Sequence, residues 1–119
     1  MHPVTREELL AAREAGPVQL VEALAADAYT AEHISGARNV PGRLTAEPAE
    51  AVAPDRATAV VVYCSGPYRN RSTITAAAFV RLGYADVRIY AGGKQDRAQA
   101  GLAFAGSRAS APAGVGRAA

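Results

Sequence analysis

The sequence ATAVVVYCSGPYRNRS at residues 57–72 decides the fold of this chain. Its first part, residues 57–63, is an apolar run without alternation, which is typical of a central strand in a parallel sheet covered on both faces. A polar segment with glycine and proline follows Cys64, and residues 72–82 then predict a helix that Gly83 ends. The apolar stripe of this helix is formed by Ile74, Ala78 and Leu82. The stretch therefore predicts a strand, a loop that starts at the cysteine, and a helix.

Elements of the same two kinds are predicted on both sides of this stretch. Thr5 and Glu8 have the spacing of a capping box, and a helix of about ten residues follows and ends near Gly16. Further strands are predicted at residues 18–21, 37–40 and 87–90, and further helices or helical turns at residues 27–33, 44–52 and 94–100. Strands that alternate with helices predict an α/β domain with a mostly parallel sheet, whose ligands bind at the C-terminal ends of the strands.

The size and composition of the chain indicate one globular domain. Its 119 residues are 50% hydrophobic and 20% charged, and this length is enough for one hydrophobic core but not for two. After Phe104 the sequence consists mainly of glycine, alanine, serine and proline, which is typical of a disordered tail. We therefore expect a domain at residues 1–105 and a flexible C-terminal tail at residues 106–119.

Charge and hydropathy argue against several classes of partner. The formal net charge is +2, Lys94 is the only lysine, and the arginines form no basic stripe, so the sequence does not indicate a nucleic-acid-binding protein. No apolar run approaches the roughly 18 residues that cross a bilayer, and the N-terminus does not resemble a signal peptide. We expect a cytoplasmic protein that binds neither nucleic acid nor a membrane.

Cys64 is the only cysteine, which rules out an internal disulfide or a zinc site built from several cysteines. Taken alone, it is either a small apolar residue at the end of a buried strand or a reactive thiol. Its setting favours the thiol, because the N–H groups of a loop that leads into a helix N-terminus can hold an anion beside the sulfur. Arg69 and Arg71 add positive potential, which favours the thiolate and a persulfide.

The candidate site requires neither a metal ion nor an organic cofactor. It consists of Cys64 as the catalytic residue and an anion-binding loop that follows it. The loop is formed by Ser65, Gly66, Pro67, Tyr68, Arg69, Asn70, Arg71 and Ser72. We expect its ligand to be a small anion.

The order of several motifs resembles the rhodanese family over residues 4–104. Residues 20–22 (LVE) resemble the first core strand, which ends in an acidic residue, and residues 29–41 (YTAEHISGARNVP) resemble the family's Tyr…Gly-His-Ile-Pro-Gly-Ala…Asn-Ile-Pro segment. Residues 61–64 (VVYC) match the strand and its catalytic cysteine. The Gly-Gly pair after the last predicted strand and the later Ala-Gly-Leu resemble the closing motif of the family.

This resemblance implies a rhodanese-like three-layer fold with a central, mostly parallel five-stranded sheet flanked by helices. It also implies a sulfurtransferase, in which Cys64 takes a sulfane sulfur from thiosulfate or another persulfide. The sulfur then passes to a thiol, to cyanide or to a protein acceptor. Glu22 and His33 are candidate supporting residues, although a histidine in such a turn is more often held by hydrogen bonds to the backbone.

The sequence departs from the family pattern at several positions. Leu24 stands where an arginine is common, and Arg97 stands where a tryptophan is usual. The loop is a Cys-x-Gly-Pro variant, in which Arg69 takes the place of a second cysteine that would resolve the persulfide. Two alternatives therefore stay open beside the sulfurtransferase. One is a small oxyanion enzyme of the phosphatase or arsenate-reductase type, and the other is a non-catalytic module that senses sulfur or redox state.

Overall fold

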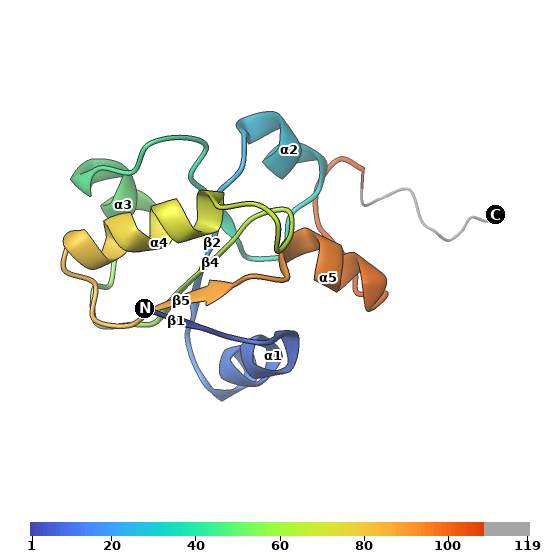
Figure 1. Ribbon diagram of the computed structural model, residues 1–119, viewed down its shortest axis with the longest axis horizontal. Coiled ribbons are helices and arrows are strands. Elements are labelled where there is room, and N and C mark those ends of the chain that lie inside the picture. The colour runs from blue at the N-terminus through green and yellow to red at the C-terminus, as the bar shows by residue number, and fades with distance from the viewer. Residues whose placement is uncertain (109–119) are drawn as a thin grey trace.

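A computed structural model of the protein describes residues 1–108 and shows a five-stranded sheet between two layers of helices (Figure 1). The strands are β1 (His2–Pro3), β2 (Gln19–Glu22), β3 (Arg38–Asn39), β4 (Val60–Tyr63) and β5 (Val87–Tyr90). They lie in the order β1-β5-β4-β2-β3, and every neighbouring pair is parallel. The predicted α/β class and its parallel sheet are confirmed.

The helices are α1 (Arg6–Ala15), α2 (Ala26–Ala31), α3 (Ala46–Val52), α4 (Arg71–Arg81) and α5 (Gly93–Gln99). Helix α1 begins at the predicted capping box, in which the Thr5 hydroxyl accepts from the Glu8 N–H and the Glu8 carboxylate accepts from the Thr5 N–H. Pro48 does not interrupt α3, because it lies in the first turn, where a backbone N–H has no partner within the helix.

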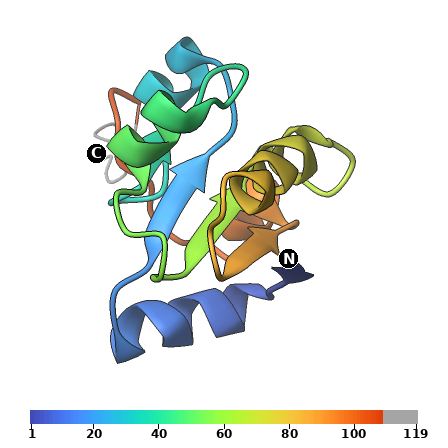
Figure 2. The same ribbon diagram turned by 90° about the vertical axis from the view of Figure 1, so that its left-hand side faces the viewer.

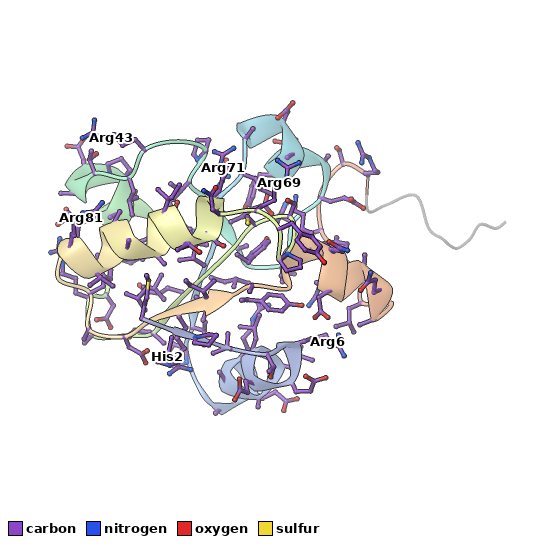
Figure 3. The ribbon with its side chains drawn as sticks, in the orientation of Figure 1. His2, Arg6, Arg43, Arg69, Arg71 and Arg81 are labelled. Carbon is purple, nitrogen blue, oxygen red and sulfur yellow. The ribbon has the colours of Figure 1, made fainter. Side chains whose placement is uncertain are left out.

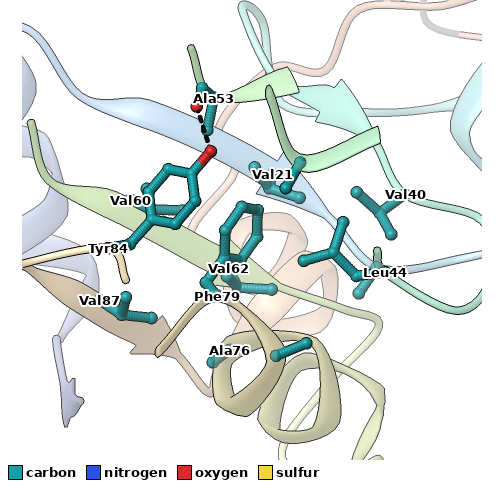
Figure 4. Close-up of a cluster of buried hydrophobic side chains, with 13 residues drawn as sticks. Val21, Val40, Leu44, Ala53, Val60, Val62, Ala76, Phe79, Tyr84 and Val87 are labelled. Carbon is teal, nitrogen blue, oxygen red and sulfur yellow. Dashed lines mark hydrogen bonds between the residues drawn. The ribbon is translucent and has the colours of Figure 1, made fainter. Parts of the chain in front are cut away.

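The two faces of the sheet are covered by different helices (Figure 2). Val60 and Val62 of β4 belong to a cluster that includes Phe79 of α4, and Val61 and Tyr63 belong to a second cluster on the face that α1 covers. In the first cluster the Tyr84 hydroxyl donates to the carbonyl of Ala53, 2.6 Å away (Figure 4). The strand is therefore buried on both sides, as its unbroken apolar run predicts.

The face that helix α4 turns to the sheet coincides only in part with its apolar stripe. Ile74, the first residue of that stripe, is 60% exposed, whereas Ala76 and Phe79 are fully buried. Ser72 and Thr75 complete the buried face, at the i, i+3, i+4 and i+7 spacing of one helix side. The small side chains of Ser72, Thr75 and Ala76 let the helix approach the sheet, and the large ring of Phe79 fills the space between the helix and the sheet. Of the predicted stripe, Ala78 is buried in the same cluster and Leu82 packs against it, so only Ile74 lies outside the core face.

Two parts of the described chain were not predicted from the sequence. β1 consists of only two residues, one of them a proline, and pairs with β5 at the edge of the sheet, where proline is tolerated. At the other end, the backbone N–H groups of Ser107 and Arg108 donate to carbonyls of α2, at 2.9 Å in each case. The rest of the predicted tail, residues 109–119, lies outside the described residues, and the boundary at residue 105 stays a prediction.

No helix within residues 1–108 is long and apolar enough to cross a membrane.

Candidate active site

Cys64 directly follows β4 and lies at the C-terminal edge of the sheet, between the ends of β2 and β5. Its side chain is buried, and three oxygen atoms surround the sulfur. Sγ lies 3.5 Å from Oγ of Ser72 and 3.9 Å from each of the carbonyl oxygens of Gly66 and Arg69. Since Ser72 belongs to the first turn of α4, the sulfur sits between the loop and the start of this helix.

The N-terminus of α4 has no side-chain cap. Asn70 occupies the N-cap position, but its side chain makes no capping hydrogen bond. The first N–H groups of a helix have no partner within it, and the dipole of this 11-residue helix adds positive potential at the same end. The two carbonyls near Sγ suit a protonated thiol, whereas the Ser72 hydroxyl and the N–H groups of the first turn suit a negatively charged sulfur.

The two arginines of the loop lie near this end of α4 but point in different directions (Figure 3). The guanidinium of Arg71 donates to the carbonyl of Pro41, 2.5 Å away, and is thereby held toward the segment after β3. Arg69 is exposed, and its backbone N–H donates to the carbonyl of Gly66 at 3.2 Å. The ring of Tyr68 is 93% exposed and points into solvent. The structure thus gathers the predicted loop around Cys64 without a guanidinium in contact with the sulfur.

The turn between β5 and α5 holds the start of the loop, and the sequence had not placed it in the site. The N–H of Lys94 donates to the carbonyl of Cys64 at 3.0 Å, and the N–H of Gln95 donates to the carbonyl of Ser65 at 2.8 Å. At Gly93 the angle φ is +59°, and a Cβ atom there would lie 2.3 Å from the carbonyl oxygen of Cys64. A signal for this contact was the Gly-Gly pair, which follows a predicted strand at the same edge of the sheet.

A buried carboxylate lies beneath this turn. Glu22 at the end of β2 is fully buried, and its Oε1 accepts a hydrogen bond of 2.7 Å from the Tyr63 hydroxyl. Lys94 Nζ lies 3.0 Å from Oε2 as an ion pair, although this contact lacks the angles of a hydrogen bond. Burial, reinforced by the negative charge of Glu22, raises the pKa of Tyr63 far above its usual value, so this hydroxyl stays a donor. Glu22 therefore joins β2, β4 and α5 below the cysteine loop.

His33, the other candidate supporting residue, is held by its own surroundings. Its Nδ1 lies 2.7 Å from the carbonyl of Tyr29, and its ring stacks on the Tyr29 ring with 4.0 Å between the centroids. Its backbone pairs with Ala105 in both directions. These contacts agree with the structural interpretation of this histidine, and none of them involves the cysteine loop.

We expect the change Ser72→Ala to slow the reaction of Cys64 with iodoacetamide at neutral pH about tenfold, because a hydrogen bond to a charged group contributes roughly 1.5 kcal/mol or more. The hydroxyl that would donate to the thiolate is then absent, while the backbone of α4 is unchanged. The rate is measured over a range of pH. Thr73→Ala, at an exposed position of the same helix turn, is the matched control and should react as the unmodified protein does. Equal rates for both variants would contradict a role for Ser72.

Comparison with known proteins identifies the family of this chain. Residues 5–99 match the sequence pattern of the family described as "Rhodanese-like domain". A segment of 65 residues is 43% identical to an HTH-type transcriptional regulator of Mycobacterium tuberculosis, and it covers 55% of this chain and 28% of that protein. The chain therefore spans much less than half of this regulator.

Solved structures show the same fold. The thiosulfate sulfurtransferase of Pseudomonas aeruginosa superposes with a TM-score of 0.77 at 27% identity, over 89% of this chain and 20% of that one. A protein of Bacillus halodurans superposes with a TM-score of 0.81 at 24% identity, over 94% of this chain and 82% of that one. The matched pattern runs from the capping box of α1 to the last residue of α5, and it includes the cysteine that ends the central strand of a parallel sheet. This chain belongs to the rhodanese-like domain family.

Proposed function

We propose that this protein is a sulfurtransferase that carries sulfane sulfur as a persulfide on Cys64. The observation that carries the proposal is the position of Sγ, 3.5 Å from Oγ of Ser72 in the first turn of α4, whose N-cap side chain leaves the helix N-terminus open. A persulfide places its negative charge on the outer sulfur, which the Ser72 hydroxyl and the N–H groups of this turn would stabilise. Membership of the family and the likeness to a thiosulfate sulfurtransferase support the same activity.

The proposed reaction has two displacement steps. In the first, the thiolate of Cys64 attacks the sulfane sulfur of thiosulfate, the S–S bond of the donor breaks, and sulfite leaves with the bonding electron pair. In the second, an acceptor thiolate or cyanide attacks the outer sulfur of the persulfide and releases the Cys64 thiolate. Neither step needs an external oxidant or reductant, because the oxidation level of the transferred sulfur comes from the donor.

Access to the sulfur requires movement of the loop. Cys64 is 2% exposed, so a donor reaches Sγ only when the residues over it shift. Residues 67–70 at the tip of the loop are exposed, whereas the hydrogen bonds to the β5–α5 turn lie at its start, at Cys64 and Ser65. We infer that the tip shifts to admit the donor while the start of the loop stays anchored.

Intact-mass spectrometry after incubation with thiosulfate tests the proposal. We expect the protein to gain the mass of one sulfur atom and to lose it again on treatment with cyanide or dithiothreitol. The variant Cys64→Ala should gain no mass under the same conditions. An unmodified wild-type protein, or an equal gain in Cys64→Ala, would refute persulfide formation at this residue.

A second candidate, a module that senses sulfur or redox state, is favoured by the 43% identity to part of a transcriptional regulator. It predicts the same loading of Cys64 but no catalytic turnover. The rate of thiocyanate formation from thiosulfate and cyanide distinguishes the sulfurtransferase from the sensing module. Repeated turnover supports the enzyme, whereas a single equivalent of sulfur per chain supports the sensor.

A further inference from the structure

A cavity of ≈ 470 Å³ lies between residues 42–46 and one side of α4. It is lined by the apolar stripe Ile74, Ala78 and Leu82, of which Ile74 is 60% exposed, whereas Ala78 and Leu82 also contact the core. Leu44 lines it from the opposite side. This volume is within the range of about 300–1,000 Å³ that is usual for ligand pockets. The stripe therefore faces an open apolar site that adjoins the cysteine loop at Arg71 but contains none of the residues in contact with the sulfur.

Three arginines line the same cavity, and no acidic residue does. Arg43 and Arg81 lie toward the C-terminal end of α4, and Arg71 lies at its N-terminal end (Figure 3). Within residues 1–108, neither Arg43 nor Arg81 makes an ion pair or a side-chain hydrogen bond, and Arg71 bonds only to a backbone carbonyl. The cavity thus combines an apolar lining with positive charges that no acidic side chain of the described residues neutralises.

The spacing of these charges indicates an elongated ligand. Ten residues separate Arg71 from Arg81, which corresponds to ~15 Å along a helix. An extended peptide rises ~3.3 Å per residue, so about five residues cover this distance. A single small oxyanion would contact only one end of the cavity and would leave its apolar lining uncovered. Acidic side chains at both ends of a short peptide, with apolar side chains between them, complement both the charge and the lining.

We propose that this cavity, the α4 groove (Arg43, Leu44, Arg71, Ile74, Ala78, Arg81 and Leu82), binds a short acidic segment of a partner protein. The apolar side chains of the segment cover Ile74 and Leu82, and its carboxylates pair with the guanidinium groups at the two ends. Cys64 is not part of this surface. The inference therefore does not depend on sulfur transfer, and it assigns to this domain a docking function in addition to its chemistry.

The test is a titration of the full 119-residue protein into a fluorescein-labelled peptide, Glu-Glu-Leu-Leu-Glu-Glu, followed by fluorescence anisotropy. We expect saturable binding, which the double variant Arg43→Gln/Arg81→Gln weakens about tenfold because two charge pairs are lost. Ile74→Ser should weaken it about threefold, through loss of apolar contact. Arg108→Gln removes one exposed charge elsewhere and should leave binding unchanged. Urea unfolding of each variant serves as the folding control, because it reports the folded state whether or not Cys64 carries sulfur.

Two reference ligands show whether binding depends on the apolar side chains of the peptide and whether the groove prefers a peptide to a nucleic acid. The peptide Glu-Glu-Ser-Ser-Glu-Glu carries the same charge without apolar side chains and should bind at least about fivefold more weakly. Equal affinity for the two peptides, unchanged binding by the double variant, or no saturation would each overturn the proposal. Tighter binding of a ten-residue oligothymidylate than of the acidic peptide would also overturn it, in favour of nucleic acid. If the groove fails these tests while Cys64 loads normally, the proposed sulfur chemistry is unaffected.

Discussion

Replacing Lys94 by alanine is expected to lower the free energy of unfolding by about 3 kcal/mol, because removal of one partner leaves a buried charge uncompensated. The carboxylate of Glu22 is fully buried, and Lys94 is the cation that lies against its Oε2 atom, at 3.0 Å. The lysine side chain is itself only 16% exposed, so water replaces its ammonium group poorly. It also donates to the carbonyl of Ala28, and this bond is lost as well.

Urea unfolding of the wild type and of four variants, including the single change Glu22→Gln, measures this effect. Lys94→Met keeps most of the side-chain volume and should be destabilised nearly as much as Lys94→Ala. The double variant Glu22→Gln/Lys94→Met should lose less than the two single changes add up to, by about 1–3 kcal/mol, because neutral glutamine needs no counter-ion. Its amide oxygen can still accept from the Tyr63 hydroxyl.

The matched control is Arg108→Ala. Arg108 and Glu32 form an exposed pair 4.0 Å apart, and its loss should change stability by less than about 0.5 kcal/mol. If Lys94→Ala is as mild as this control, or if the single changes at Glu22 and Lys94 are additive, the charge of Lys94 does not stabilise the buried carboxylate. Additivity would then assign the stabilisation of Glu22 to Tyr63 alone.

The ion pair also connects stability to the site. The backbone N–H of Lys94 donates to the carbonyl of Cys64, while its ammonium group contacts Glu22 beneath. One residue therefore fixes the β5–α5 turn to the cysteine loop on one side and to the sheet on the other. Leu24 carries no charge, and Lys94 brings a positive charge to this end of β2 from a distant part of the sequence.

The sequence was most informative where a short local pattern determines the structure of the residues next to it. The apolar run before Cys64, the capping box at Thr5 and the glycine after α4 each act on neighbouring residues, and the strand and both helices were predicted close to their observed bounds. The position of the cysteine at the end of a central strand followed from the same local pattern. Its chemistry is inferred from that position, and persulfide formation stays a proposal.

The sequence was least informative where distant segments meet. Nothing local to Lys94 indicates that it pairs with Glu22, 72 positions earlier, because this contact depends on how β2 and β5 are placed in the sheet. The apolar stripe of α4 coincides with its buried face only in part for a similar reason. Periodicity identifies apolar positions such as Ile74, but the packing of Phe79 against the sheet decides which of them are buried.

A methyl group at Gly93 should lower the free energy of unfolding nearly as much as the loss of the Lys94 side chain does. In the change Gly93→Ala, the new Cβ would lie 2.3 Å from the carbonyl oxygen of Cys64 and 3.1 Å from the backbone nitrogen of Gly66. Both are backbone atoms, so the turn and the loop must separate. With φ at +59°, alanine also adopts an unfavourable left-handed conformation. We expect a loss of about 3 kcal/mol in the free energy of unfolding and, because the loop is displaced, at least about tenfold slower loading of Cys64 by thiosulfate.

Gly83→Ala is the control that separates the close contact from the backbone conformation. Gly83 has φ +93° after the end of α4, but a Cβ atom there would meet nothing within 4 Å. This variant should lose only about 1 kcal/mol, from backbone strain, and should load sulfur at the wild-type rate. Urea unfolding and the time course of the mass gain measure the two effects on both proteins. If Gly93→Ala loads as fast as Gly83→Ala, the β5–α5 turn does not position the cysteine loop, and the loop must hold its own shape through Ser72 and the first turn of α4.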